Sequence, residues 1–179
     1  MFDKTLHMKK LVILFLFIFN IFSAQNMDEG TGISLLKIGD KVPQFTFENL
    51  NGNIVDINQF KGKYILINFF ATWCEPCVRE MPLIENEIWN INKSNEDFII
   101  LSFGRGHSND EVKKFIESKK FTFPIFSDEQ KIVFNLFAKS FIPRNYIIDK
   151  DGVVIYSEGG FREEEFQKMK EKIIDLLKR

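Results

Sequence analysis

The stretch Tyr64-Ile-Leu-Ile-Asn-Phe-Phe-Ala-Thr-Trp-Cys-Glu-Pro-Cys77 decides how the rest of this sequence is interpreted. It joins an apolar run, typical of a strand buried on both faces, to the only two cysteines of the chain. Pro76 suits the first turn of a helix, where a backbone N–H has no helical partner. The pattern therefore predicts a central strand, Tyr64–Phe70, followed by a cysteine pair at the start of a helix.

The spacing of Cys74 and Cys77 suits reversible disulfide chemistry. Cysteines three positions apart in the first helical turn share a face, with Cα atoms about 5–6 Å apart, so a disulfide can form with little backbone movement. The partial positive charge at a helix N-terminus favours the thiolate, which is the nucleophile. Cys77 lies further into the helix, so we predict Cys74 as the nucleophile and Cys77 as the residue that resolves a mixed disulfide.

Two other interpretations of the cysteine pair are weaker. A purely structural bridge would close a loop too short to remove much chain entropy. A metal site needs further cysteine or histidine ligands, and the chain has only His7 and His107. We therefore expect a redox-active Cys74–Cys77 disulfide, with no metal and no cofactor.

Composition limits the possible classes. A length of 179 residues allows one domain plus a targeting segment, and a net charge of -1 offers no basic surface for nucleic acid. The 21 phenylalanines are first of all core residues.

The N-terminus has the pattern of a secretory signal. The basic segment Met8-Lys9-Lys10 precedes a short apolar segment, and small residues end at Ala24. We predict a signal peptide over 1–24, with Met8 as an alternative start and an uncleaved anchor as the alternative outcome. A flexible lead-in over 25–37 and one domain over 38–179 would follow. The domain would then be periplasmic or otherwise extracytoplasmic, soluble after cleavage or tethered by the N-terminal segment, where disulfides form.

The order of predicted elements favours an α/β fold. Strands around Phe45–Phe47 and 53–57, joined at Asn51-Gly52, would form an N-terminal β-hairpin. A helix from Glu75 to Ile91, kinked at Pro82, would follow the central strand. Further segments complete a central mixed sheet flanked by helices on both faces. They are a strand at 97–103, a helix from Ser108, an extended edge segment at 121–126, a helical segment at 130–138, strands at 144–149 and 153–157, and a terminal helix at 162–178.

The segment Asn68-Phe-Phe-Ala-Thr-Trp-Cys-Glu-Pro-Cys77 resembles the TlpA-like branch of the thioredoxin superfamily. Those proteins are extracytoplasmic thiol-disulfide oxidoreductases, several of which serve cytochrome c maturation. The mid-domain helix and strand over Ser108–Phe126 match an insertion of that branch. Lys37–Phe47 also resembles the opening of the related alkyl-hydroperoxide-reductase (AhpC/TSA) group. The resemblance implies a thioredoxin-like fold over most of the chain beyond the signal.

The resemblance also implies a substrate-binding surface. Ile142-Pro143 matches the position of the superfamily's cis-proline loop, where Ile142 would offer backbone groups to a substrate strand. Trp73 would pack beside the sulfur atoms and shape the docking surface, or alternatively belong to the core. We assign Trp73, Ile142 and Pro143 to substrate binding.

Asn68 departs from thioredoxin itself, which has a buried aspartate at this position. The proton acceptor must then be another acid or water. Glu87 and Asp97 are the two acids we consider, and the sequence does not choose between them.

The predicted reaction is the reduction of disulfides in extracytoplasmic partner proteins, with cytochrome c maturation as one setting. Glu75 and Pro76 would modulate the pair, because a carboxylate between the cysteines disfavours a second negative charge. The less stable thiolate makes a reductant, so a membrane electron donor is expected. We expect a monomer that binds no nucleic acid, and that contacts a membrane only if its N-terminal segment is uncleaved.

Two alternatives remain. A thiol peroxidase of the AhpC/TSA group would hold its peroxide with a Pro…Thr/Ser…Cys loop, but Ile67 and Ala71 occupy the equivalent positions. A copper-delivery domain could bind Cu(I) through Cys74, Cys77 and His107, since thiolates are soft ligands.

Overall fold

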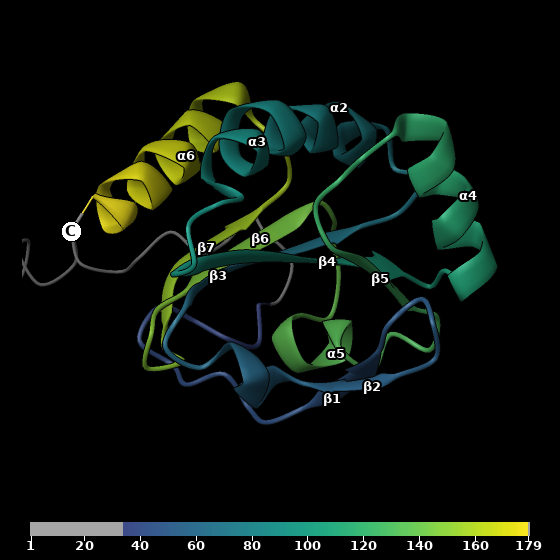
Figure 1. The fold of residues 1–179 in the computed structure, drawn as a ribbon, viewed down its shortest axis with the longest axis horizontal. Helices are drawn as coiled ribbons and strands as arrows, with labels where there is room; N and C mark the ends of the chain where they lie inside the picture. The colour runs from purple at the N-terminus through teal and green to yellow at the C-terminus, as the bar shows by residue number, and fades with distance from the viewer. Residues whose placement is uncertain (1–33, 179) are drawn as a thin grey trace, which may run out of the picture. The chain divides into compact units, whose positions relative to one another are not determined.

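A computed structural model of the protein describes residues 34–178. The predicted signal segment 1–24 and most of the lead-in lie outside the described residues. A five-stranded sheet crosses the centre of the domain, with the spatial order β5-β4-β3-β6-β7 (Figure 1). Its strands are β3 (Tyr64–Phe70), β4 (Phe98–Arg105), β5 (Ile125–Asp128), β6 (Arg144–Ile148) and β7 (Val154–Gly159).

The sheet is mixed, as predicted. Strand β3 pairs in parallel with β4, and β4 with β5, while β6 and β7 run antiparallel to their neighbours. Every residue of β3 after Tyr64 is buried, because the strand is central and both of its faces are covered. The domain therefore has the thioredoxin-like α/β fold that the sequence predicts.

Successive residues of β3 point to opposite faces and separate two cores. Leu66 and Phe70 belong to the core that also contains both cysteines. Ile65, Ile67 and Phe69 belong to the second core. Asn68 shares the face of Leu66 and Phe70, so its side chain points toward the cysteine helix.

Helical segments cover the face of the sheet that contacts the cysteines, called here the cysteine face (Figure 1). A continuous helical stretch runs through α2 (Glu75–Leu83), the π-helical η2 (Ile84–Trp89) and α3 (Asn90–Asn92). It is joined on this face by α4 (Asn109–Lys119) and α6 (Glu163–Leu177). The α-helical hydrogen bonding changes near Pro82: the wider π-type pattern begins two residues after this proline, which cannot donate a backbone hydrogen bond.

The opposite face is covered by α5 (Phe134–Phe137) and by the hairpin of β1 (Thr46–Glu48) and β2 (Ile54–Asp56). A short 3-10 turn, η1 (Ile57–Phe60), follows the hairpin. Phenylalanine rings fill this core, often edge to face; Phe47, for example, lies 4.7 Å from Phe126 between ring centroids. The hairpin is thus anchored by aromatic packing and is not part of the central sheet.

Two predicted segments are shorter in the structure. Helical structure between 130 and 138 is confined to α5, because the Asp128 carboxylate accepts the amides of Val133 and Phe134 and fixes the preceding turn. The extended segment at 121–126 becomes a strand only from Ile125, as the edge strand β5. Within the described residues, no helix is sufficiently long and apolar to traverse a bilayer.

Candidate active site

The cysteine pair lies where β3 passes into α2. Cys74 is the N-cap residue of α2, and its Sγ accepts the backbone N–H of Cys77 at 3.3 Å. The two Cα atoms are 5.3 Å apart and the sulfurs form a disulfide. Cys77 is fully buried and Cys74 is 6% exposed. The more accessible sulfur is thus the one at the mouth of the helix, as the sequence predicts.

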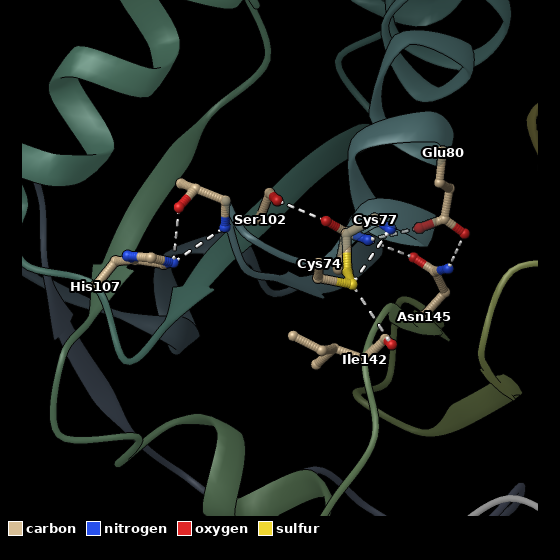
Figure 2. Close-up of a disulfide and its surroundings, with 9 residues drawn as sticks. Cys74, Cys77, Glu80, Ser102, His107, Ile142 and Asn145 are labelled. Atoms are coloured by element: carbon tan, nitrogen blue, oxygen red, sulfur yellow. Dashed lines mark hydrogen bonds between the residues drawn. A yellow bond between two sulfur atoms is a disulfide. The ribbon is translucent and has the colours of Figure 1, made fainter.

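The loop before β6 lies against this disulfide. The Ile142–Pro143 peptide bond is cis, and the carbonyl oxygen of Ile142 lies 3.7 Å from Cys74 Sγ (Figure 2). Trp73 is 70% exposed, which argues against the alternative that it is a core residue. The structure therefore brings Ile142, Pro143 and the cysteines together, with Trp73 on the surface next to Cys74 in the chain.

A buried carboxyl lies one helical turn after Cys77. Glu80 Oε1 accepts the side-chain N–H of Asn145 at 2.6 Å, and Glu80 Oε2 accepts that of Asn68 at 3.2 Å. Asn68 Nδ2 also donates to Asn145 Oδ1, while Asn68 Oδ1 accepts the hydroxyl of Ser102 at 2.7 Å. Figure 2 shows this network behind the disulfide, reaching from β4 through β3 to β6 and α2.

Burial raises the pKa of Glu80 to about 8, and the hydrogen bonds from Asn145 and Asn68 only partly oppose this effect. Such a carboxyl exchanges protons readily with a thiol, whose ordinary pKa is about 8.5. Glu80 can therefore hold a proton near neutral pH and give or take one with little driving force either way.

Neither acid named from the sequence lies in a fully buried position. Glu87 is half-buried and pairs with Lys170 at 2.7 Å. Asp97 is exposed and pairs with Lys150, which lowers the pKa of its carboxyl. The sequence did carry a signal for Glu80: it lies three residues after Cys77, on the same helical face, opposite the one polar residue of the buried strand.

A known protein family matches most of this chain. The profile of the AhpC/TSA family matches residues 38–157. The chain belongs to the AhpC/TSA family. Curated relatives from this family include the thiol-disulfide oxidoreductase ResA of Geobacillus kaustophilus, 37% identical over 65% of this chain and 66% of the relative. ResA of Bacillus thuringiensis subsp. konkukian is 30% identical over 80% of this chain and 79% of its own length.

Solved structures agree with this assignment. The solution structure of a candidate protein disulfide isomerase from Bacteroides thetaiotaomicron matches with a TM-score of 0.78 and 31% identity, covering 83% of this chain and 95% of that one. The thioredoxin domain of a thiol-disulfide oxidoreductase from Bacteroides vulgatus matches with a TM-score of 0.66 and 26% identity, covering 77% and 98%. This AhpC/TSA member is a thioredoxin-like thiol-disulfide oxidoreductase of the ResA-like kind.

The peroxide-holding positions of other AhpC/TSA members carry apolar residues in this chain. Ile67 and Ala71 are both fully buried, and neither offers a hydrogen bond to a peroxide. The geometry gives the peroxidase alternative no support.

His107 is buried after β4 and faces the segment before the cysteines (Figure 2). Its Nε2 accepts the backbone N–H of Thr72 at 3.0 Å. Among the described residues, no group of three or more His, Cys, Asp or Glu side chains is arranged to hold a metal ion. The copper site of Cys74, Cys77 and His107 therefore has no counterpart in this geometry.

Proposed function

We propose that this protein reduces disulfides in partner proteins outside the cytoplasm, with Cys74 as the nucleophile and Cys77 as the resolving residue. The observation that carries the proposal is the arrangement around one disulfide. Its outer sulfur borders the Ile142-Pro143 loop, its inner sulfur is fully buried, and a carboxyl with a raised pKa lies one turn beyond.

The proposed reaction transfers two electrons. The Cys74 thiolate attacks one sulfur of the partner disulfide, which forms a mixed disulfide and releases one partner thiolate. Cys77 then loses its proton and attacks Cys74 Sγ, which releases the second partner thiolate and forms the Cys74–Cys77 disulfide. The partner is reduced, this protein is oxidised, and an external dithiol donor must return two electrons before the next turn.

Glu80 is the proposed proton acceptor for Cys77. Burial of Cys77 disfavours its thiolate, so the second step needs a base close by. The pKa of Glu80, about 8, is close to that of a thiol, which suits this exchange better than an ordinary carboxylate would. Asn68 and Asn145 hold the carboxyl in place from β3 and β6.

The backbone of Ile142 and the exposed indole of Trp73 are the proposed contacts for the partner polypeptide. Glu75 is exposed between the cysteines and Pro76 fills the first turn, so both are proposed to tune the pair. A carboxylate at this place opposes a second negative charge on Cys74, which favours the reducing direction. The signal-like N-terminus supports an extracytoplasmic location and a membrane electron donor, with cytochrome c maturation as one setting.

The decisive experiment combines an activity with a trap. The oxidised protein is equilibrated with dithiothreitol to obtain its potential, and insulin reduction is followed by turbidity. The Cys74→Ser variant should lose the activity, whereas Cys77→Ala should accumulate a mixed disulfide that identifies the partner. An absence of insulin reduction together with a potential as high as the roughly -120 mV of a strong oxidant would overturn the proposal.

A further inference from the structure

His107 is buried although histidine is a polar residue and lies in a loop. It is 4% exposed, and it packs where β4 passes toward α4. Gly104 allows the end of β4 to pack closely against α4 and β3, since a Cβ there would lie 3.0 Å from Val112 Cγ2 and 3.3 Å from Phe70 Cζ. The loop therefore brings the imidazole close under the chain that leads into Cys74.

One ring nitrogen of His107 is an acceptor for the active-site segment. Nε2 lies 3.0 Å from the backbone N of Thr72 and 3.4 Å from Thr72 Oγ1. A backbone N–H can only donate, so Nε2 carries no proton and the neutral ring carries its proton on Nδ1. Thr72 is two residues before Cys74 and directly precedes Trp73, so this bond fixes the backbone that presents both side chains.

The other ring nitrogen faces a carboxylate. Within residues 34–178, Nδ1 has no hydrogen-bond partner, and Glu111 Oε2 lies 3.6 Å away. The same oxygen accepts the backbone N–H of Ser108 at 2.8 Å in the capping box of α4. The Ser108 hydrogen bonds lower the pKa of Glu111, so its charge faces the Nδ1 proton and favours that tautomer.

We propose that His107, with its tautomer selected by Glu111, is a positioning residue for the Thr72–Cys74 segment. It acts through the Thr72 amide and does not touch the reacting sulfurs. Its effect would fall on the step in which Cys74 attacks the partner, because that step depends on how Trp73 and Cys74 are presented. The inference rests on the proposed disulfide reduction and adds a residue to it.

Two variants of His107 separate the acceptor from the packing. In His107→Gln the side-chain amide oxygen reaches the place of Nε2 and can accept the Thr72 N–H. In His107→Phe the ring volume is kept and the acceptor is lost. We expect kcat/KM for insulin reduction to fall about tenfold in the Phe variant and to stay within about threefold of wild type in the Gln variant, since tenfold corresponds to about 1.4 kcal/mol.

The spectroscopic readout is independent of activity. The Thr72 amide proton resonance should move upfield in His107→Phe and stay near its wild-type position in His107→Gln. In Glu111→Gln, which can still accept the Ser108 N–H, the imidazole ¹⁵N resonances should shift toward a mixture of the two tautomers. The melting temperature of each variant controls for a general loss of structure.

Equal losses of kcat/KM in the Phe and Gln variants, or an unmoved Thr72 resonance in the Phe variant, would overturn the inference. If the Phe variant does not fold, the Gln and Glu111→Gln spectra decide: wild-type imidazole resonances in Glu111→Gln would refute tautomer selection. If the wild-type protein does not reduce insulin, the proposed function fails, while the two spectra still test the positioning contacts.

Discussion

Replacing Glu80 by glutamine removes the buried acid with little change in side-chain shape. In the folded protein the pKa of Glu80 is raised from 4.5, the ordinary value for a glutamate, to about 8. The folded state therefore keeps a proton that the unfolded state loses, so this contribution to stability is complete below pH 4.5 and is lost as pH rises through 8. At about 1.36 kcal/mol per pKa unit, the free energy of unfolding should fall by roughly 3–4 kcal/mol between pH 5 and pH 8 from this group.

Urea unfolding of the oxidised protein, measured at intervals from pH 5 to pH 8, checks this value. The Glu80→Gln variant should lose roughly 3–4 kcal/mol less than wild type over the same range, whatever its stability at pH 5. Glu87→Gln is the matched control, because Glu87 follows in the same helical stretch but is half-buried and paired with Lys170. Parallel pH profiles for wild type and Glu80→Gln would refute the assignment of Glu80 as a buried acid that holds a proton.

Four further substitutions have definite expected outcomes. Cys74→Ser should abolish insulin reduction, and Cys77→Ala should stop the reaction at a mixed disulfide, visible as a band on a non-reducing gel. Asn68→Asp places a second carboxyl where Asn68 Nδ2 now donates to Glu80 at 3.2 Å. Urea unfolding should show the free energy of unfolding lowered by roughly 3 kcal/mol at neutral pH and by less at pH 5. Phe137→Ala empties a fully buried position in the aromatic core and should cost about 3–5 kcal/mol, measured as a lower melting temperature with the redox potential unchanged.

The fold and the cysteine pair could be predicted because the determining residues are consecutive in the sequence. The apolar run of β3 indicates a central strand, Pro76 indicates a helix start, and the Cys74–Cys77 spacing fixes the geometry of the pair. These features follow from local backbone geometry, so consecutive residues are enough to predict them.

The partners of the site could not be predicted in the same way, because they are set by which strands become neighbours. Asn68 and Asn145 lie opposite each other only when β3 pairs with β6 in the observed register. A glutamate in a helix is usually exposed, so the position of Glu80 three residues after Cys77 is a weak signal until two amide groups are seen to converge on it. The contact of His107 could not be predicted for the same reason. Its sequence context suggests a surface loop, and its hydrogen bond with Thr72 depends on the pairing of β3 with β4.

The alternation of β3 has a practical consequence for engineering this scaffold. The cysteines and the amide network lie on one face of the sheet. The aromatic core lies on the other face and stabilises the fold separately. A designer who wants a different potential or a different client can vary even-numbered β3 positions and the loop before α2, leaving the odd-numbered ones untouched. The redox chemistry and the stability of the aromatic core can then be changed nearly independently, because the backbone of the sheet separates the two sets of side chains.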